Sequence, residues 1–112
     1  MSNSLIAKFN ITTAKTTITL QNIDATSINW GDGTTTNGEL THTYSRTGVY
    51  TCSMDGVTTI GQYAFNGCRL LTSVTIGNSV TTIEEYAFSG CRSLTSVAIG
   101  DSVTAIGDFA FG

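Results

Sequence analysis

Few side chains in this 112-residue sequence could do chemistry, and their spacing does not form a catalytic pattern. His42 is the only histidine, so a Ser-His-Asp or Cys-His system would have to use it. It lies in residues 39–45, which read as a strand, and no strained Gly-x-Ser-x-Gly turn is present. Glu84 and Glu85 are adjacent, so their carboxylates point in different directions and make a poor acid–base pair. The sequence predicts a protein that is not an enzyme.

The cysteines and aspartates do not predict a metal site either. Cys52, Cys68 and Cys91 lack C-x-x-C spacing, and a single histidine is available to complete a zinc site. Asp32 lies in Gly-Asp-Gly without the alternating aspartates of a calcium loop. We interpret it as a tight turn in which Asp32 accepts hydrogen bonds from backbone amides. No cofactor is predicted.

The amino-acid composition argues against a nucleic-acid partner and against a membrane span. Charged residues make up 12% of the chain, while Thr and Ser number 21 and 11, which favours β-structure with a hydroxyl-rich surface. The net charge is −3, and the five basic residues do not cluster, so no nucleic-acid partner is expected. No apolar run approaches the roughly 18 residues of a membrane span. The first ten residues do not resemble a signal peptide, so the chain is either intracellular or, as its abrupt C-terminus favours, an excised piece.

The second half of the sequence repeats itself. GVTTIGQYAFNGCRLLTSVTIG (56–77) is followed by SVTTIEEYAFSGCRSLTSVAIG (79–100) and SVTAIGDFAFG (102–112). Aligning Val57, Val80 and Val103 brings the apolar positions into coincidence with a period of 23 and no gap. The predicted units are 57–79, 80–102 and a partial 103–112, about two and a half coils.

Each unit has two readable parts. Residues 71–77 predict a short strand with Leu71, Val74 and Ile76 facing inward, and residues 60–68 predict a single helical turn or a tight convex segment. One coil cannot bury its own apolar side, so the coils must stack at about 4.8 Å. Stacking places Cys68 beside Cys91, where we expect buried thiols, with a disulfide as the alternative.

The motif I-G-x-x-A-F-x-x-C-x-x-L-x-x-V-x-I in these units resembles the BspA-like class of leucine-rich repeats over residues 57–112. Glu84 departs from the usual glycine, and Gly77 and Gly100 stand where that class often has proline. The resemblance implies a short leucine-rich-repeat solenoid. It also implies an extracellular or cell-surface location in a parent protein, with a role in adhesion and protein binding.

The first 56 residues do not repeat, and they predict a β-rich domain that caps the solenoid. Five stretches read as strands separated by turns: 5–11, 16–23, 26–33, 39–45 and 48–54. WGDGTTTNGELTHTYSRTGVYT (30–51) resembles the second half of a polycystic-kidney-disease-type domain, an immunoglobulin-like sandwich. That resemblance makes His42 a structural strand residue. Ile28 and Trp30 are expected to face inward.

At the junction, residues 48–57 should belong both to the N-terminal part and to the repeats. Cys52 and Met54 can take the places of Val74 and Ile76, so we expect this strand to be the first rung of the parallel repeat sheet. The small N-terminal sandwich or sheet would then share the core of the repeats.

The predicted function is a non-catalytic protein-binding or adhesion module from a larger surface protein. The alternative is a structural or assembly component, of a phage or a cell envelope, in which the repeats are scaffold. The expected contact face consists of small residues between the buried ones: Ser73, Thr75, Ser96 and Ala98. The ligand is expected to be a protein or a cell-surface molecule.

The C-terminal end of the stack is predicted to be open. The strand edge Leu94–Ile99, with Val97 at its centre, has no coil beyond it, and Phe109 and Phe111 lack cover. We therefore expect the chain to form a homodimer through Leu94, Val97, Ile99, Phe109 and Phe111.

Overall fold

The computed structural model describes residues 4–111, and every regular element in that range is a strand. The predicted domains begin at residue 1 and end at residue 112, so residues 1–3 and 112 of them lie outside the described part. The strands are β1 (Leu5–Ile11), β2 (Thr16–Thr19), β3 (Ser27–Asn29), β4 (Thr35–Thr36), β5 (Thr41–Tyr44), β6 (Gly48–Asp55), β7 (Thr59–Ile60), β8 (Leu71–Thr75), β9 (Thr82–Ile83), β10 (Ser96–Ala98) and β11 (Ala105–Ile106). The five predicted N-terminal strands are confirmed, and β4 is an addition.

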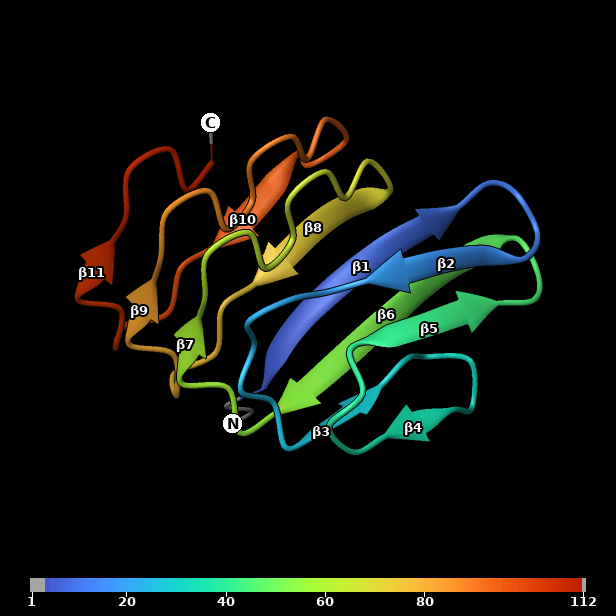
Figure 1. Ribbon diagram of the computed structural model, residues 1–112, viewed down its shortest axis with the longest axis horizontal. Helices are drawn as coiled ribbons and strands as arrows, with labels where there is room; N and C mark the ends of the chain where they lie inside the picture. Colours follow the sequence, from blue (N-terminus) through green and yellow to red (C-terminus); the bar gives the residue numbers. More distant parts are fainter. Residues whose placement is uncertain (1–3, 112) are drawn as a thin grey trace.

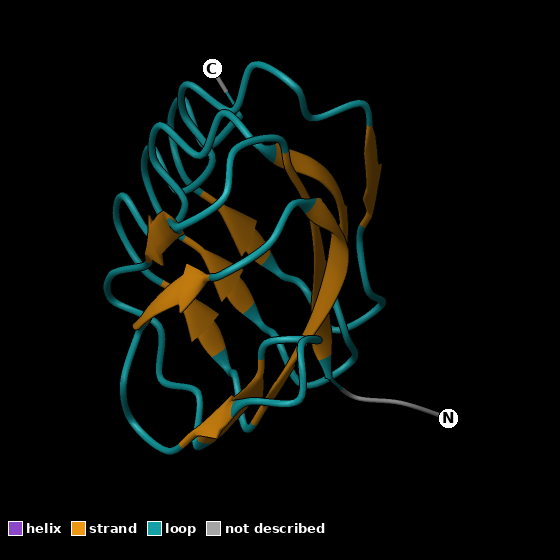
Figure 2. Cartoon of the chain, turned by 90° about the vertical axis from the view of Figure 1, so that its right-hand side faces the viewer, coloured by secondary structure: helices purple, strands orange, loops and turns teal. Residues whose placement is uncertain are grey.

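The strands form three sheets around one core. The largest has six strands in the order β10-β8-β1-β6-β3-β4, the second is β11-β9-β7, and the third is the pair β2-β5. Figure 1 shows the two smaller sheets over the same side of the large one, and Figure 2 shows the strands as facing layers. Apolar residues alternate with polar ones along β1 and β6, so one face of the large sheet fills the core. Ile28 and Trp30 are buried in it, as predicted.

The repeat period fixes how the coils stack. β8 pairs with β10, and β9 pairs with β7 and β11, all parallel and in register. Each residue lies beside its equivalent in the next unit: Ser96 opposite Ser73, and Ile83 opposite Ile60. Threonine hydroxyls reinforce the ladder, because Thr81 Oγ1 donates to the Thr58 carbonyl 23 residues earlier at 3.3 Å. The predicted mainly β architecture is confirmed, and the parallel pairing of equivalent residues agrees with the predicted repeat.

The convex part of each coil is a series of tight turns. In the first unit the amide of Ala64 donates to Gly61, that of Asn66 to Tyr63, and that of Cys68 to Phe65. These three-residue steps never develop into a helix, so of the two predicted forms the tight convex segment is correct.

The strand that borders the repeats is β1, and the prediction for residues 48–57 is wrong. β6 does not pair with β8, because β1 lies between them and is antiparallel to both. Met54 pairs with Leu5 of β1 and not with a repeat strand. The first strand of the chain can take this place because its alternation of buried and exposed residues matches both neighbours. One sheet therefore contains strands from both sides of the predicted domain boundary between residues 56 and 57.

A second set of contacts joins the N-terminal half to the first coil on the opposite sheet. Ile23 forms an isolated bridge with Ile60, and the Gly61 amide donates to the Asn22 carbonyl at 2.9 Å. Asp24 accepts hydrogen bonds from the amides of Thr58 and Thr59 at 3.0 and 3.3 Å, and from the Thr58 hydroxyl. Burial alone would raise the pKa of Asp24, but these hydrogen bonds outweigh it and hold the pKa below 3.8.

Asp24→Asn should therefore lower stability in a pH-dependent way. A carboxylate whose pKa is depressed by folding stabilises the protein above its unfolded pKa and loses that effect as the pH falls through the folded value. At pH 7 we expect a loss of about 1 kcal/mol in the free energy of unfolding, small because Asp24 is exposed, and no loss near pH 2. Urea unfolding at the two pH values measures this, with Asp108→Asn as the exposed control. An equal deficit at both pH values would contradict the role of the charge.

Candidate functional site

The one histidine lies in a cluster of aromatic rings and not beside a nucleophile. His42 Nε2 is 2.7 Å from Asp32 Oδ2, and the imidazole stacks on the Trp30 indole with a centroid distance of 5.0 Å. Asp32 Oδ1 also accepts the amide of Thr34 at 3.1 Å, which confirms the turn predicted for it. Partial burial by itself would raise the pKa of Asp32. The hydrogen bonds from His42 and Thr34 together outweigh this effect and hold the pKa below 3.8. The contact between Asp32 and His42 holds the Trp30–Thr34 turn against β5.

The nearby thiol is kept neutral by its surroundings. Cys52 is fully buried on β6, and the Tyr44 hydroxyl lies 2.9 Å from its sulfur and donates to the Trp30 carbonyl at 2.7 Å. Burial raises the pKa of Cys52 to about 11. Since the thiolate is the nucleophile, this cysteine is inert near neutral pH. The cluster is thus built to hold the fold in place.

Cys68 and Cys91 occupy equivalent positions on stacked coils. Both are free thiols, which agrees with the prediction of thiols and not with the alternative of a disulfide. They are half-buried and not fully buried, because they lie in the convex turns. Burial, followed by the neighbouring Cys91, raises the pKa of Cys68 to about 12. Among residues 4–111, no three His, Cys, Asp or Glu side chains gather in a group that could hold a metal ion.

Two ladders of aromatic rings run along the stack. Phe65, Phe88 and Phe111 stack inside with centroid distances of 4.9 and 5.0 Å. Tyr63, Tyr86 and Phe109 stack outside, at 5.3 and 5.4 Å. The outer three all have positive φ, between 58° and 62°, which is rare for bulky residues and costs about 1–3 kcal/mol each. The sequence pattern gave no sign of this conformation.

The predicted contact face lies on the outward side of the six-stranded sheet. Thr75, Ser96 and Ala98 are exposed and Ser73 is half-buried. The structure brings all four together, because Ser96 lies opposite Ser73 and Ala98 opposite Thr75.

Sequence reasoning missed that this face continues onto the N-terminal strands. Ser73 is opposite Lys8, which is opposite Thr51; Thr75 is opposite Ile6, which is opposite Ser53. The period-2 alternation of β1 could have identified Ile6 and Lys8 as outward residues, but not as neighbours of the repeats. The outward face, as we name it, thus comprises Ser73, Thr75, Ser96, Ala98, Ile6, Lys8, Thr51 and Ser53.

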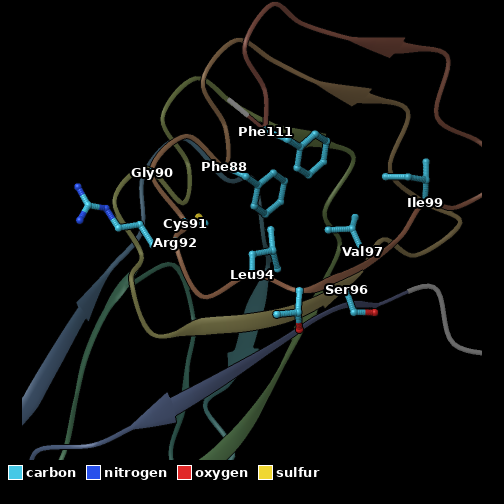
Figure 3. A pocket seen from close by; sticks show the side chains of 10 residues that line it. Phe88, Gly90, Cys91, Arg92, Leu94, Ser96, Val97, Ile99 and Phe111 are labelled. Carbon is cyan, nitrogen blue, oxygen red and sulfur yellow. The ribbon is translucent and has the colours of Figure 1, made fainter.

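The residues predicted for self-association gather at the C-terminal end. β10 is the last strand of its sheet, and Leu94 and Val97 are half-buried. Ile99, Phe109 and Phe111 are 44%, 64% and 42% exposed. A cavity of about 630 Å³ opens here, with Phe88, Leu94 and Phe111 toward its interior and Arg92 and Ile99 at opposite ends (Figure 3). Ile106, 52% exposed, adds to the same end and was not predicted.

Comparison with known protein families gives a match over residues 41–112 to the BspA type leucine rich repeat region (6 copies). The matched range is well over half of the sequence. The chain belongs to the BspA-type leucine-rich repeat family. No curated protein and no solved structure matches the chain.

The BspA-type match begins at Thr41, so it includes β5 and β6 as well as the coils predicted from residue 57 onward. Leucine-rich repeats of this kind are typically non-catalytic scaffolds that mediate protein binding or adhesion, and BspA-type proteins are typically surface-associated. Nowhere in residues 4–111 is there a helix long and apolar enough to cross a membrane.

Proposed function

We propose that this chain is a non-catalytic binding module of a larger adhesive surface protein, and that its outward face contacts a protein ligand. The observation that carries the proposal is the continuity of that face from β10 to β6 across the two halves. It spans four strands and is largely polar, and Lys8 places a positive charge near its centre. Such surfaces suit a folded protein partner better than a small molecule, which needs a concave apolar site.

We further infer that residues 57–111 form a short solenoid and that residues 4–56 act as its cap. Two observations support the cap: β1 satisfies the exposed edge of β8, and residues 22–24 bond the first coil on the opposite sheet. Repeat proteins need such protection at their ends. The turn at Trp30–Thr34, held by His42, supports the polycystic-kidney-disease-type, immunoglobulin-like character of this half.

The double substitution Thr75→Arg with Ser96→Arg tests the face. Two bulky charges on the β8 and β10 strands of this face should weaken binding to a protein ligand at least about 10-fold, because misplaced charge at an interface is costly. The chain is immobilised, and the retention of a panel of purified extracellular matrix proteins is measured by surface plasmon resonance. Thr19→Arg with Thr41→Arg is the matched control, since these two threonines are also exposed and lie on neighbouring strands, but on the opposite sheet.

Equal weakening by both double variants would show that the face is not the contact. If no protein is retained even by the unmodified chain, the binding role fails and the structural alternative takes its place.

A further inference from the structure

A groove separates β2 from the convex turn of the first coil, and both of its walls are interior segments of the chain. Two backbone hydrogen bonds mark its ends: the Gln21 amide donates to the Ala64 carbonyl at 3.2 Å, and the Asn10 amide donates to the Leu70 carbonyl at 2.8 Å. Between these contacts β2 and residues 66–70 diverge and enclose a groove of about 390 Å³. β2 and this turn lie over the same side of the six-stranded sheet (Figure 1).

The wall formed by β2 is a strand edge. Within residues 4–111, β5 is the sole neighbour of β2 in its sheet. The Leu20 amide donates to the Leu40 carbonyl at 2.8 Å, so the backbone groups of the even-numbered residues of β2 face β5. The backbone groups of Thr17 and Thr19 therefore point to the other side, into the groove. The odd-numbered Gln21 follows the same alternation, because its amide is directed to the coil.

A side-chain contact supports this orientation of the backbone. The hydroxyls of Thr17 and Thr43 lie 2.7 Å apart across the strand pair, and side chains approach most closely in pairs that exchange no backbone hydrogen bonds. In the described part of the chain, no protein group bonds the outward N–H and C=O groups of Thr17 and Thr19. The groove is thus bordered by two donors and two acceptors that an added strand can use.

The opposite wall adds a positive charge above an apolar floor. Arg69 is exposed, and among residues 4–111 no carboxylate forms an ion pair with it. The groove is lined by no acidic side chain, and the exposed Lys15 directly precedes β2. Three lining residues are buried or half-buried: Ile18, Cys68 and Leu70. An occupant should therefore be apolar toward the core and negative toward solvent.

We propose that this groove binds an extended peptide of alternating apolar and acidic residues, which adds to β2 as an antiparallel strand. In that arrangement Thr17 and Thr19 each exchange two hydrogen bonds with one peptide residue. Those two peptide residues point to the exposed side, where Arg69 lies, so they are the acidic ones. The residues between them point toward Ile18 and Leu70 and are apolar. β2 spans about 13 Å, so the site takes a segment of four or five residues.

This peptide site is separate from the outward face, because it lies between β2 and the first coil and not on the six-stranded sheet. Thr19 borders the groove, whereas Thr75 and Ser96 do not. A ligand weakened by Thr19→Arg with Thr41→Arg, but not by Thr75→Arg with Ser96→Arg, would accordingly occupy the groove. The two proposals can therefore fail independently.

The test uses the 112-residue chain and the capped, fluorescently labelled peptide Val-Asp-Val-Asp-Val, with binding followed by fluorescence anisotropy. Arg69→Glu should raise the dissociation constant about 5-fold or more, because an attraction becomes a repulsion. Arg92→Glu is the matched control, since it makes the same charge change at the equivalent position of the next coil and should leave binding unchanged. The peptide Val-Lys-Val-Lys-Val should show the reverse preference and bind Arg69→Glu more tightly than the unmodified chain.

Two further measurements report on strand addition itself. Methylation of both aspartate amides of the peptide should weaken binding about 10-fold or more, because it removes both donors to β2. Saturation with the unmethylated peptide should slow amide hydrogen exchange at Thr17 and Thr19, whereas the amide of Ile18 already faces β5 and should change little.

Absence of binding at peptide concentrations up to about 1 mM would overturn the proposal. Binding that Arg69→Glu and Arg92→Glu weaken equally would overturn it too, because the peptide would then respond to net charge and not to the groove. Unchanged exchange at Thr17 and Thr19 in the saturated complex would show that no strand is added to β2.

Discussion

Phe65→Ala should lower the free energy of unfolding by about 4 kcal/mol, whereas Phe111→Ala should lower it by only about 1 kcal/mol. Both residues belong to the inner ladder of phenylalanines. Phe65 is fully buried in the core and stacks on Phe88, so its removal leaves a cavity that the surrounding strands cannot fill. Phe111 is 42% exposed, and alanine there leaves Phe88 uncovered on one side without creating a closed void.

Chemical denaturation followed by tryptophan fluorescence measures both values, because Trp30 is the only tryptophan and is fully buried. The protein should be dilute, so that contacts between copies do not contribute. Equal losses for the two variants would show that the last coil packs as tightly as the first. That outcome would contradict the open end.

Gly31→Ala should destabilise the protein by about 3 kcal/mol, and Gly33→Ala by about 1–2 kcal/mol. Both glycines have positive φ, 86° and 93°, so alanine is strained at either position. Only at Gly31 would the new methyl group meet other atoms, because it would lie 2.5 Å from the Thr51 carbonyl oxygen on β6. At Gly33 nothing lies within 4 Å.

The pair of variants separates backbone strain from steric exclusion within a single turn. Equilibrium unfolding in urea gives both free energies, and the difference between them is the cost of moving the turn away from β6. Far-ultraviolet circular dichroism checks that each variant is folded. If Gly33→Ala proved as costly as Gly31→Ala, the close approach to Thr51 would play no part.

The stacking of the coils could be predicted from sequence because it depends only on the length of the repeat. A period of 23 without a gap makes every inter-coil pair an equivalent pair, as Ser73 with Ser96 shows. Local alternation likewise predicted β1 and β6 closely, since inward residues such as Leu5 and Cys52 have to face the core.

The order of strands in the large sheet could not be predicted in the same way. β1 and β6 carry the same alternation, so either could border β8, and nothing local distinguishes them. The choice depends on contacts between residues far apart in sequence, such as Asp24 with Thr58 and Ala7 with Val74. A single sequence states which side of a strand is apolar, but it does not state which neighbour that strand will take.

The candidate sites, too, were predictable where they depend on the repeat and not where they depend on the order of strands. The contact residues on β8 and β10 followed from the repeat, and so did the exposed edge at β10. The extension of the face to Lys8 and Thr51 depends on the position of β1 and was missed. The hydrogen bond between His42 and Asp32 was also missed, because turn geometry brings together side chains that a strand pattern treats separately.

The central position of β1 has a consequence for how the chain acquires its structure during synthesis. β1 is synthesised before its two neighbours, β6 and β8, which are completed only at residues 55 and 75. Until then Leu5, Ala7, Phe9 and Ile11 form an apolar strip with no place to dock, and such strips attract chaperones and other nascent chains. Folding must wait for these distant pairings, which slows it and joins both halves in a single cooperative transition. A chain that stops before residue 75 would therefore leave this strip open to proteases, whereas β1 is covered on both edges once β6 and β8 have formed.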